Sequence, residues 1–149
     1  MQLTPRGLAV SELAIAVFRA NGALIAAGDT LTRPAGLTSA RWQVLGVIDH
    51  APATVADIAR TMGLRRQSVQ QTADALAADG LAAFADNPRH RRAKLLEPTA
   101  HGRSALAEVE RAHAEWADAL AAALPPSQIE AATAALRALT DALEPEGSR

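Results

Sequence analysis

The chain has 149 residues, 49% of them hydrophobic, which is enough apolar material to bury the core of one domain. It has no cysteine, which excludes disulfides and thiolate metal sites. Because aromatic residues are scarce, the core must consist of small aliphatic residues, a composition that favours helix. The net charge of −1 hides a basic middle, because seven Arg and Lys stand against three Asp between Arg60 and Lys94. No signal peptide is evident and no apolar run approaches about 18 residues, so we expect a cytoplasmic protein with no membrane partner.

Two helices are predicted before the basic middle. The first runs from about residue 7 to 27, where apolar residues recur at spacings of three and four. The second begins at Thr38 or Ser39, either of which can cap it, and ends before Pro52. It turns three large apolar side chains inward: Trp42, Leu45 and Ile48.

The next two helices form a predicted helix-turn-helix. Thr54 caps the third helix, with Asp57 three residues later as in a capping box, and Gly63 ends it with the positive φ of a tight turn. The fourth helix spans about 66–78, and Ala59 permits a close crossing of the pair. The predicted packing positions are Ile58, Met62, Leu64, Val69, Ala73 and Leu76.

Donor-rich side chains remain on the outer face of the fourth helix. They are Arg65, Arg66, Gln67, Ser68, Gln70 and Gln71. Gln can pair with adenine, Arg with guanine, and Ser with a base or a phosphate, while the helix N-terminus attracts phosphate. An ordinary polar surface helix is the alternative. Arg65 stands where a Ser or Thr cap is expected.

A basic hairpin follows the helix-turn-helix. Residues 81–85 and 93–96 are predicted strands around a turn that contains proline. Four cations gather there within six residues: Arg89, Arg91, Arg92 and Lys94. Cations at such a tip can straddle a minor groove and its phosphates, so these residues are candidate DNA contacts, with a solvated basic loop as the alternative.

The two last helices favour a dimer. Thr99 can cap a helix to about residue 124 and Ser127 a helix to 143, with a frayed tail over 144–149. Apolar residues recur along both at coiled-coil spacing, more than a small domain needs for its own core. Specific binding normally needs two half-sites, so we expect a homodimer, with an intramolecular bundle as the alternative.

These motifs resemble the MarR family of winged-helix transcription regulators over nearly the whole chain. The resemblance rests on Arg41-Trp42-Gln43-Val44-Leu45, on 55–76 and on 86–102. The family wing usually has Asp-x-Arg-Asp-x-Arg, and here the same stretch is Asn87-Pro88-Arg89-His90-Arg91-Arg92. The family's Leu-Thr-x-x-Gly becomes Pro98-Thr99-Ala100-His101-Gly102, with a proline suited to a helix start.

The resemblance implies groove contact by Arg89 and, less directly, by Arg92. The family's two acids are similar to struts that hold these arginines by salt bridges, and both are replaced here. The implied fold is mostly α with a small β-hairpin wing, in a single domain over 1–149. Residues 1–33 and 99–144 would supply dimerisation helices, and 38–98 the winged helix-turn-helix lobe.

The resemblance also implies an effector pocket between the dimer base and the lobe. Its candidate residues, by placement along the chain, are Arg19, Trp42, His50, His113 and Trp116. Such a pocket could hold a small aromatic carboxylate or a phenol. His113 has an alternative interpretation as a hydrogen-bonded interface histidine in an apolar seam.

The sequence favours a homodimeric, sequence-specific regulator, a repressor on a palindromic operator, that responds to a small molecule. The alternative is a ligand-independent or architectural DNA binder. No cofactor is expected, the four histidines lack metal-site spacing, and no nucleophile is paired with a base, so we do not expect an enzyme. Bases would be contacted by Arg66, Gln67, Gln70 and Gln71, phosphates by Ser68, and the minor groove by Arg89.

Overall fold

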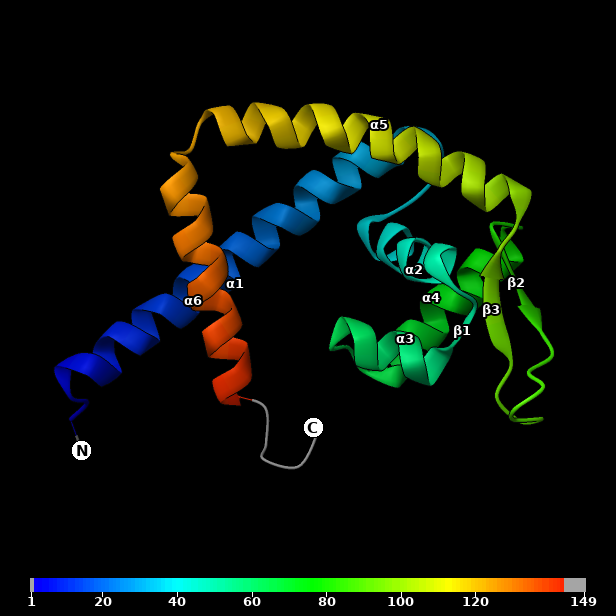
Figure 1. Ribbon diagram of the computed structural model, residues 1–149, viewed down its shortest axis with the longest axis horizontal. Helices are drawn as coiled ribbons and strands as arrows, with labels where there is room; N and C mark the ends of the chain where they lie inside the picture. The colour runs from blue at the N-terminus through cyan, green and yellow to red at the C-terminus, as the bar shows by residue number, and fades with distance from the viewer. Residues whose placement is uncertain (1, 144–149) are drawn as a thin grey trace. The chain divides into compact units, whose positions relative to one another are not determined.

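The computed structural model describes residues 2–143, so the predicted frayed tail lies outside the described residues. The chain divides into two compact units, residues 1–110 and 111–149 (Figure 1). The elements are α1 (Pro5–Thr32), the 3-10 helix η1 (Arg33–Ala35), α2 (Ser39–His50), β1 (Ala53–Thr54), α3 (Val55–Met62), α4 (Arg66–Ala78), β2 (Ala82–Ala85), β3 (Leu95–Pro98), α5 (Ala100–Ala122) and α6 (Pro126–Leu143). The predicted fold class, mostly α with a β-hairpin wing, is confirmed.

The helix-turn-helix has the predicted ends. The Thr54 hydroxyl accepts a hydrogen bond from the Asp57 amide at 3.1 Å, and Gly63 has a φ of 63° at the end of α3. Arg65, at the N-cap of α4, makes no side-chain capping bond. The turn therefore depends on the left-handed glycine and on packing between α3 and α4.

Three helix boundaries differ from the prediction. Helix α1 begins at Pro5, since the Thr4 hydroxyl accepts from the Gly7 amide at 3.1 Å and proline suits a first helical turn. It also continues to Thr32, five residues beyond the predicted end. Helix α6 begins at Pro126, so Ser127 lies inside it and is not its cap.

The wing belongs to a three-stranded antiparallel sheet with strand order β1-β3-β2. The sequence did not predict β1, because two residues are too few to show strand alternation. Pro98 ends β3 opposite Ala82 and does not start a helix; Thr99 caps α5 by accepting from the Gly102 amide at 3.1 Å. The Thr99 hydroxyl also donates to the Gly80 carbonyl at 2.7 Å, which ties the exit of the wing to the end of α4.

The core of the first unit lies among α2, α3, α4, β3 and the first half of α5. Its largest fully buried side chains are Leu45, Ile48, Ile58, Leu76 and Leu96. Leu106 and Val109 of α5 join the same cluster. The prediction that Leu64 packs the helix pair is wrong, because this residue follows the Gly63 turn and is 49% exposed.

Helix α1 carries far more apolar surface than the first unit covers. Only Gly28 and Thr32 of this helix are buried, and Phe18 is 76% exposed. By length and composition alone, the helical segment Pro5–Ala35, which contains α1, would also be able to cross a membrane. The sequence has no unbroken apolar run of that length here, because Glu12 and Arg19 interrupt it.

Candidate nucleic-acid interface

Helix α4 turns one face into the core and the opposite face outward. Val69, Ala73 and Leu76 are buried, which places positions 67, 71 and 74 on the outer side at 100° per residue. The side chains of Arg66, Gln67, Ser68 and Gln71 are exposed, and that of Gln70 is half-buried. The outer face of α4 is thus accessible enough to contact DNA along a groove.

The predicted DNA-contacting residues of α4 lie on two flanks of this face. Arg66 and Gln70 line a hollow on the wing side, and Ser68 lines another hollow toward α1 and α2. Gln67 and Gln71 lie between the flanks, where they face outward. The side-chain amide nitrogen of Gln70 donates one hydrogen to Asp74 at 2.8 Å, which leaves its second hydrogen and its carbonyl oxygen for a contact with adenine.

The wing is held by a neutral strut in place of the family's acids. Asn87 is only 9% exposed; its amide nitrogen donates to the Ala93 carbonyl at 2.9 Å, and its amide oxygen accepts from the Arg89 amide at 3.0 Å. The His90 amide donates to the Asn87 carbonyl at 3.2 Å, which closes the turn. Asn–Pro is a turn signal, and this dipeptide is the feature of the sequence that indicates such a role for Asn87.

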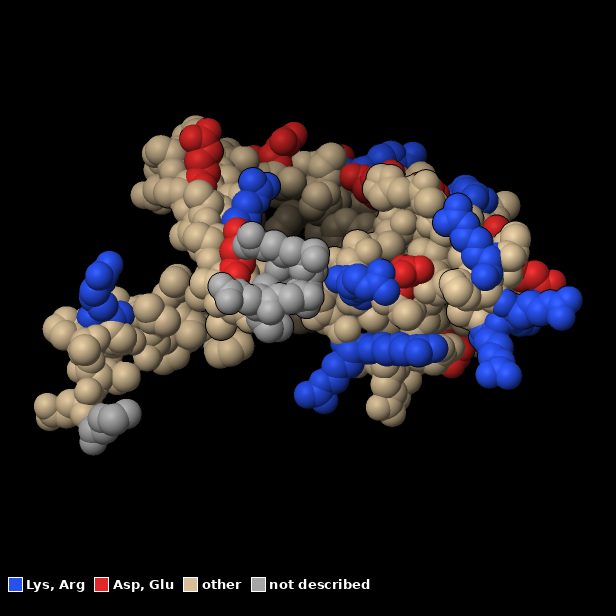
Figure 2. Space-filling model, turned by 60° about the horizontal axis from the view of Figure 1, so that its bottom comes forward, with Lys and Arg blue, Asp and Glu red and all other residues tan. Residues whose placement is uncertain are grey.

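The cations of this surface have no ion-pair partner in the part of the chain that the structure describes. Among the residues the structure describes, the ion pairs are Arg41–Asp79, Arg60–Asp57 and Arg103–Asp49, and none involves the six predicted basic contacts. Figure 2 shows Lys and Arg side chains gathered around the end that carries the wing. The cations that lie on α4 and the wing are Arg65, Arg66, Arg89, Arg91, Arg92 and Lys94, all exposed.

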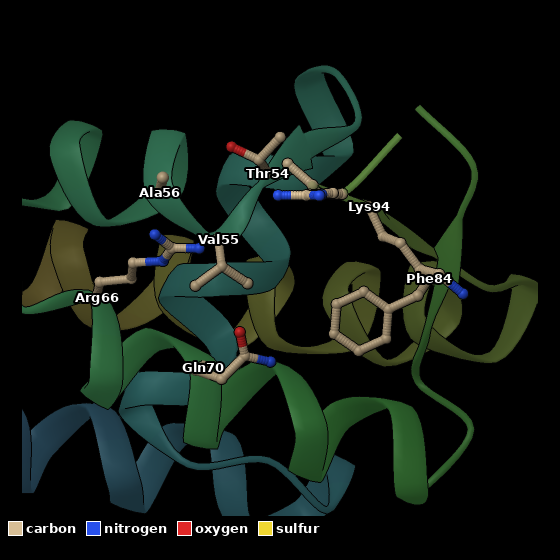
Figure 3. A pocket seen from close by; sticks show the side chains of 9 residues that line it. Thr54, Val55, Ala56, Arg66, Gln70, Phe84 and Lys94 are labelled. Atoms are coloured by element: carbon tan, nitrogen blue, oxygen red, sulfur yellow. The ribbon is translucent and has the colours of Figure 1, made fainter. Parts of the chain in front are cut away.

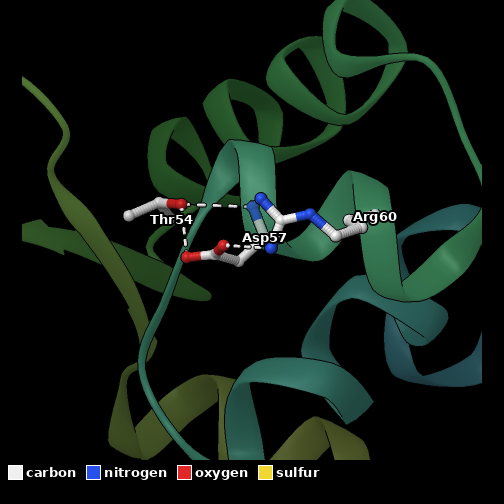
Figure 4. Close-up of polar contacts among 3 residues, drawn as sticks. All are labelled: Thr54, Asp57 and Arg60. Atoms are coloured by element: carbon white, nitrogen blue, oxygen red, sulfur yellow. Dashed lines mark hydrogen bonds and ion pairs between the residues drawn. The ribbon is translucent and has the colours of Figure 1, made fainter. Parts of the chain in front are cut away.

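Asp57, in the first turn of α3, is engaged by neighbouring side chains. Its carboxylate accepts from the Thr54 hydroxyl at 2.8 Å and pairs with Arg60 at 3.0 Å (Figure 4). The hydrogen bond from Thr54, and then Arg60, hold the pKa of Asp57 below its ordinary value. This carboxylate remains ionised near neutral pH and stabilises the start of α3.

The predicted effector residues are spread over both units. In the first unit, Arg19 and His50 are exposed and Trp42 is half-buried. The hollow beside α1 and α2, of about 470 Å³, is lined by other residues, among them Asp29, Gln43 and Thr72. In the second unit, His113 and Trp116 lie close together, with ring centroids 5.7 Å apart.

No group of three or more potential metal ligands occurs among residues 2–143. Phe84 and the start of α3, residues 54–56, also border the interface beside Arg66, and the sequence analysis did not include them. A phenylalanine in a four-residue strand carries no signal that would separate a surface role from a core one.

The family model that matches this chain is that of the MarR family, over residues 35–93, the segment from η1 through the wing turn. A relative from Mycobacterium tuberculosis, described as an uncharacterized protein, is 35% identical over 137 residues, covering 92% of this chain and 96% of the relative. The chain belongs to the MarR family. Members of this family are DNA-binding transcription regulators, and the fold described above is theirs.

Solved MarR structures agree with this chain over nearly their full length. A MarR family transcriptional regulator from Streptomyces coelicolor matches with a TM-score of 0.80 and 25% identity, over 91% of this chain and 96% of the other. The transcriptional repressor CouR, bound to a 23-mer DNA duplex, matches with a TM-score of 0.78 and 27% identity, over 94% and 99%. CouR from Rhodococcus jostii RHA1 has also been solved with p-coumaroyl-CoA (TM-score 0.69, 23% identity, 85% and 90% covered).

Proposed function

We propose that this protein is a cytoplasmic, homodimeric repressor that recognises a palindromic operator and releases it in response to a small molecule. The observation that carries the proposal is the exposed, donor-rich face of α4 beside a wing whose cations have no acidic partner among the described residues. The similarity to CouR, a repressor solved on DNA, supports the DNA-binding part.

On DNA, α4 enters the major groove and the wing follows the backbone to the minor groove. Gln67 and Gln71 contact base edges because they lie on the outermost line of α4, and Arg66 and Gln70 contact bases or phosphates from the wing flank. Arg89 reaches into the minor groove from the wing turn. Ser68 lies on the opposite flank, where a phosphate contact suits it better than a base contact.

The homodimer is supported by the apolar residues of α1 that the first unit leaves exposed. At 100° per residue, Leu13, Val17 and Leu24 form an apolar stripe along α1, and Ile15 and Phe18 lie on the other side of the helix. The helix therefore needs cover on two sides. A second copy supplies such cover and places a second recognition helix for the other half-site.

A small-molecule effector is supported by the CouR complex with p-coumaroyl-CoA, which belongs to a relative of the same fold. The ligand-independent alternative is an architectural binder with no effector. A rise in melting temperature with one compound of an aromatic acid and phenol panel would favour the effector, since a ligand that binds only the folded state stabilises it.

The deciding experiment is selection from a random duplex pool at two salt concentrations, with sequencing of the bound fraction. A palindrome with half-sites about one helical turn apart would establish the proposed function. Unselective binding that collapses as salt rises would favour the architectural alternative. The absence of binding at either salt concentration would refute both.

A further inference from the structure

A cationic hollow lies at the base of the wing, where the start of α3, the first turns of α4 and the β2–β3 hairpin meet (Figure 3). Its volume is about 290 Å³. Its walls are the start of α3 (Thr54, Val55, Ala56), the first turns of α4 (Arg66, Gln70), Phe84 of β2, and Arg92, Ala93 and Lys94 of the wing. Three of these lining residues are cations and none is a carboxylate, so the hollow suits an anion.

The start of α3 borders the same space. The first amides of a helix have no carbonyl partner within it, and Val55 and Ala56 carry two of them. The acid of this turn does not compete, because Asp57 is engaged by Thr54 and Arg60. Residues from the start of α3 and cations from α4 and the wing thus line one hollow, and Figure 3 shows the Arg66 side chain extending toward Val55.

The wing turn divides its basic residues into two groups. The turn is closed by hydrogen bonds from the His90 amide to Asn87 and from the Ala93 amide to His90, at 3.2 and 3.1 Å. Arg89 lies within this turn, and Arg91 borders a separate hollow with Asp86, Asn87 and Pro88. Arg92 and Lys94 instead line the hollow shared with α3 and α4.

We propose that this hollow is a phosphate seat, which takes one backbone phosphate of bound DNA between Arg66, Arg92 and Lys94. The inference rests on the proposed function for the source of the phosphate, while the phosphate chemistry follows from the lining itself. Arg92 and Lys94 are then backbone contacts, and minor-groove contact is left to Arg89. A single phosphate held by α3, α4 and the wing together fixes the register of the recognition helix in its groove.

The test combines Arg92→Ala and Lys94→Ala with a duplex scan in which one phosphate at a time is replaced by a neutral methylphosphonate. Each variant should bind the unmodified operator about tenfold or more weakly, as expected for a lost charge-assisted contact. A methylphosphonate at one position per half-site should weaken operator binding by the wild type to a similar extent. For a seat variant on that modified duplex, the total loss of binding free energy should be far less than the sum of the two separate losses. Arg91→Ala, from the wing turn, should remain additive with that same position.

If the losses of binding free energy from substitution and from methylphosphonate were additive at every phosphate for both Arg92→Ala and Lys94→Ala, the proposal would be overturned. Operator binding, and so the proposed function, would remain intact. If selection yields no operator, the seat is tested with pyrophosphate in place of DNA, at constant ionic strength. The amides of Ala56 and Ala93 should then show saturable NMR shifts that Arg92→Ala weakens. Shifts absent at both amides would refute a phosphate seat from either source.

Discussion

Gly102 shows how one residue of the family pattern follows from packing. A Cβ at this position would overlap the backbone carbonyl oxygen of Leu81, where α5 passes the entry to β2. The same carbonyl accepts from the Thr99 amide at 3.1 Å, so it has little freedom to move. The glycine of the Leu-Thr-x-x-Gly motif is needed for this close approach.

We expect Gly102→Ala to lower the free energy of unfolding by about 3 kcal/mol, since overpacking against backbone forces α5 away from the sheet. Chemical denaturation at fixed protein concentration would measure it. Gly46→Ala is the matched control, because a Cβ at Gly46 meets no atom within 4 Å. Equal stability of the two variants would contradict the packing argument.

The Thr54–Asp57 cap gives the molecule a pH-dependent contribution to stability. The folded state lowers the pKa of Asp57 below its ordinary value of 3.8, chiefly through the hydrogen bond from Thr54. A lowered carboxyl pKa stabilises the fold above the unfolded value, and that contribution is lost as pH falls through the folded value.

Asp57→Asn should therefore reduce the loss of unfolding free energy between neutral pH and about pH 3. Thr54→Ala should do the same and also cost about 1 kcal/mol at neutral pH as a lost cap. Denaturant titrations across this range would measure both effects. Asp118→Asn, an exposed carboxyl on α5, is the control; if it flattened the profile as much as Asp57→Asn, the assignment would be wrong.

At the scale of elements, α4 and the wing contribute differently to DNA binding. Gln71 lies on the outermost line of α4, where it can distinguish bases, whereas Arg89 carries its charge on the wing turn. Base contacts set sequence preference, and cation contacts set affinity and its salt dependence.

Gln71→Ala should relax preference at one or two operator positions with little change in the salt slope, and Arg89→Ala should weaken all sequences and reduce that slope by about one. Binding titrations on operator and scrambled duplexes at several salt concentrations would separate the two effects. Arg60→Ala, a cation paired with Asp57 on α3, serves as the control for total charge. An unchanged slope in Arg89→Ala would remove the wing from the interface.

The elements best predicted from the sequence were those whose ends are determined by residues close by in the chain. Thr54, Gly63 and the periodic burial of Val69, Ala73 and Leu76 fixed the helix-turn-helix, because caps and turns act within a few residues. Features that depend on long-range contacts could not be predicted in this way. Strand β1 exists only because β3 lies beside it, and the hollow at the wing base is assembled from three distant segments. Asn87 as a strut also needed the folded turn to be recognised.

At the scale of the whole molecule, the apolar surface of α1 can be buried either against protein or in a membrane, but not in both. A helix that is apolar on opposite sides is stable when it is buried in a protein or in a membrane. Glu12 and Arg19 lie near each other on the remaining face at 100° per residue. A helix in a protein interface can leave this charged face in water, whereas a helix surrounded by lipid cannot. The arrangement therefore favours a protein interface.

We therefore expect the wild type to be a dimer free of membranes, and Phe18→Glu to shift it toward the monomer, because a charge would replace a large apolar side chain in the interface. Sedimentation equilibrium would measure the shift, with Glu12→Gln as the control on the same helix. Loss of the dimer should also lower operator affinity, since two half-sites could no longer be bound as one unit. If the wild type sedimented with membranes and needed detergent for release, α1 would be an anchor; a dimer unaffected by Phe18→Glu would place the interface on other helices.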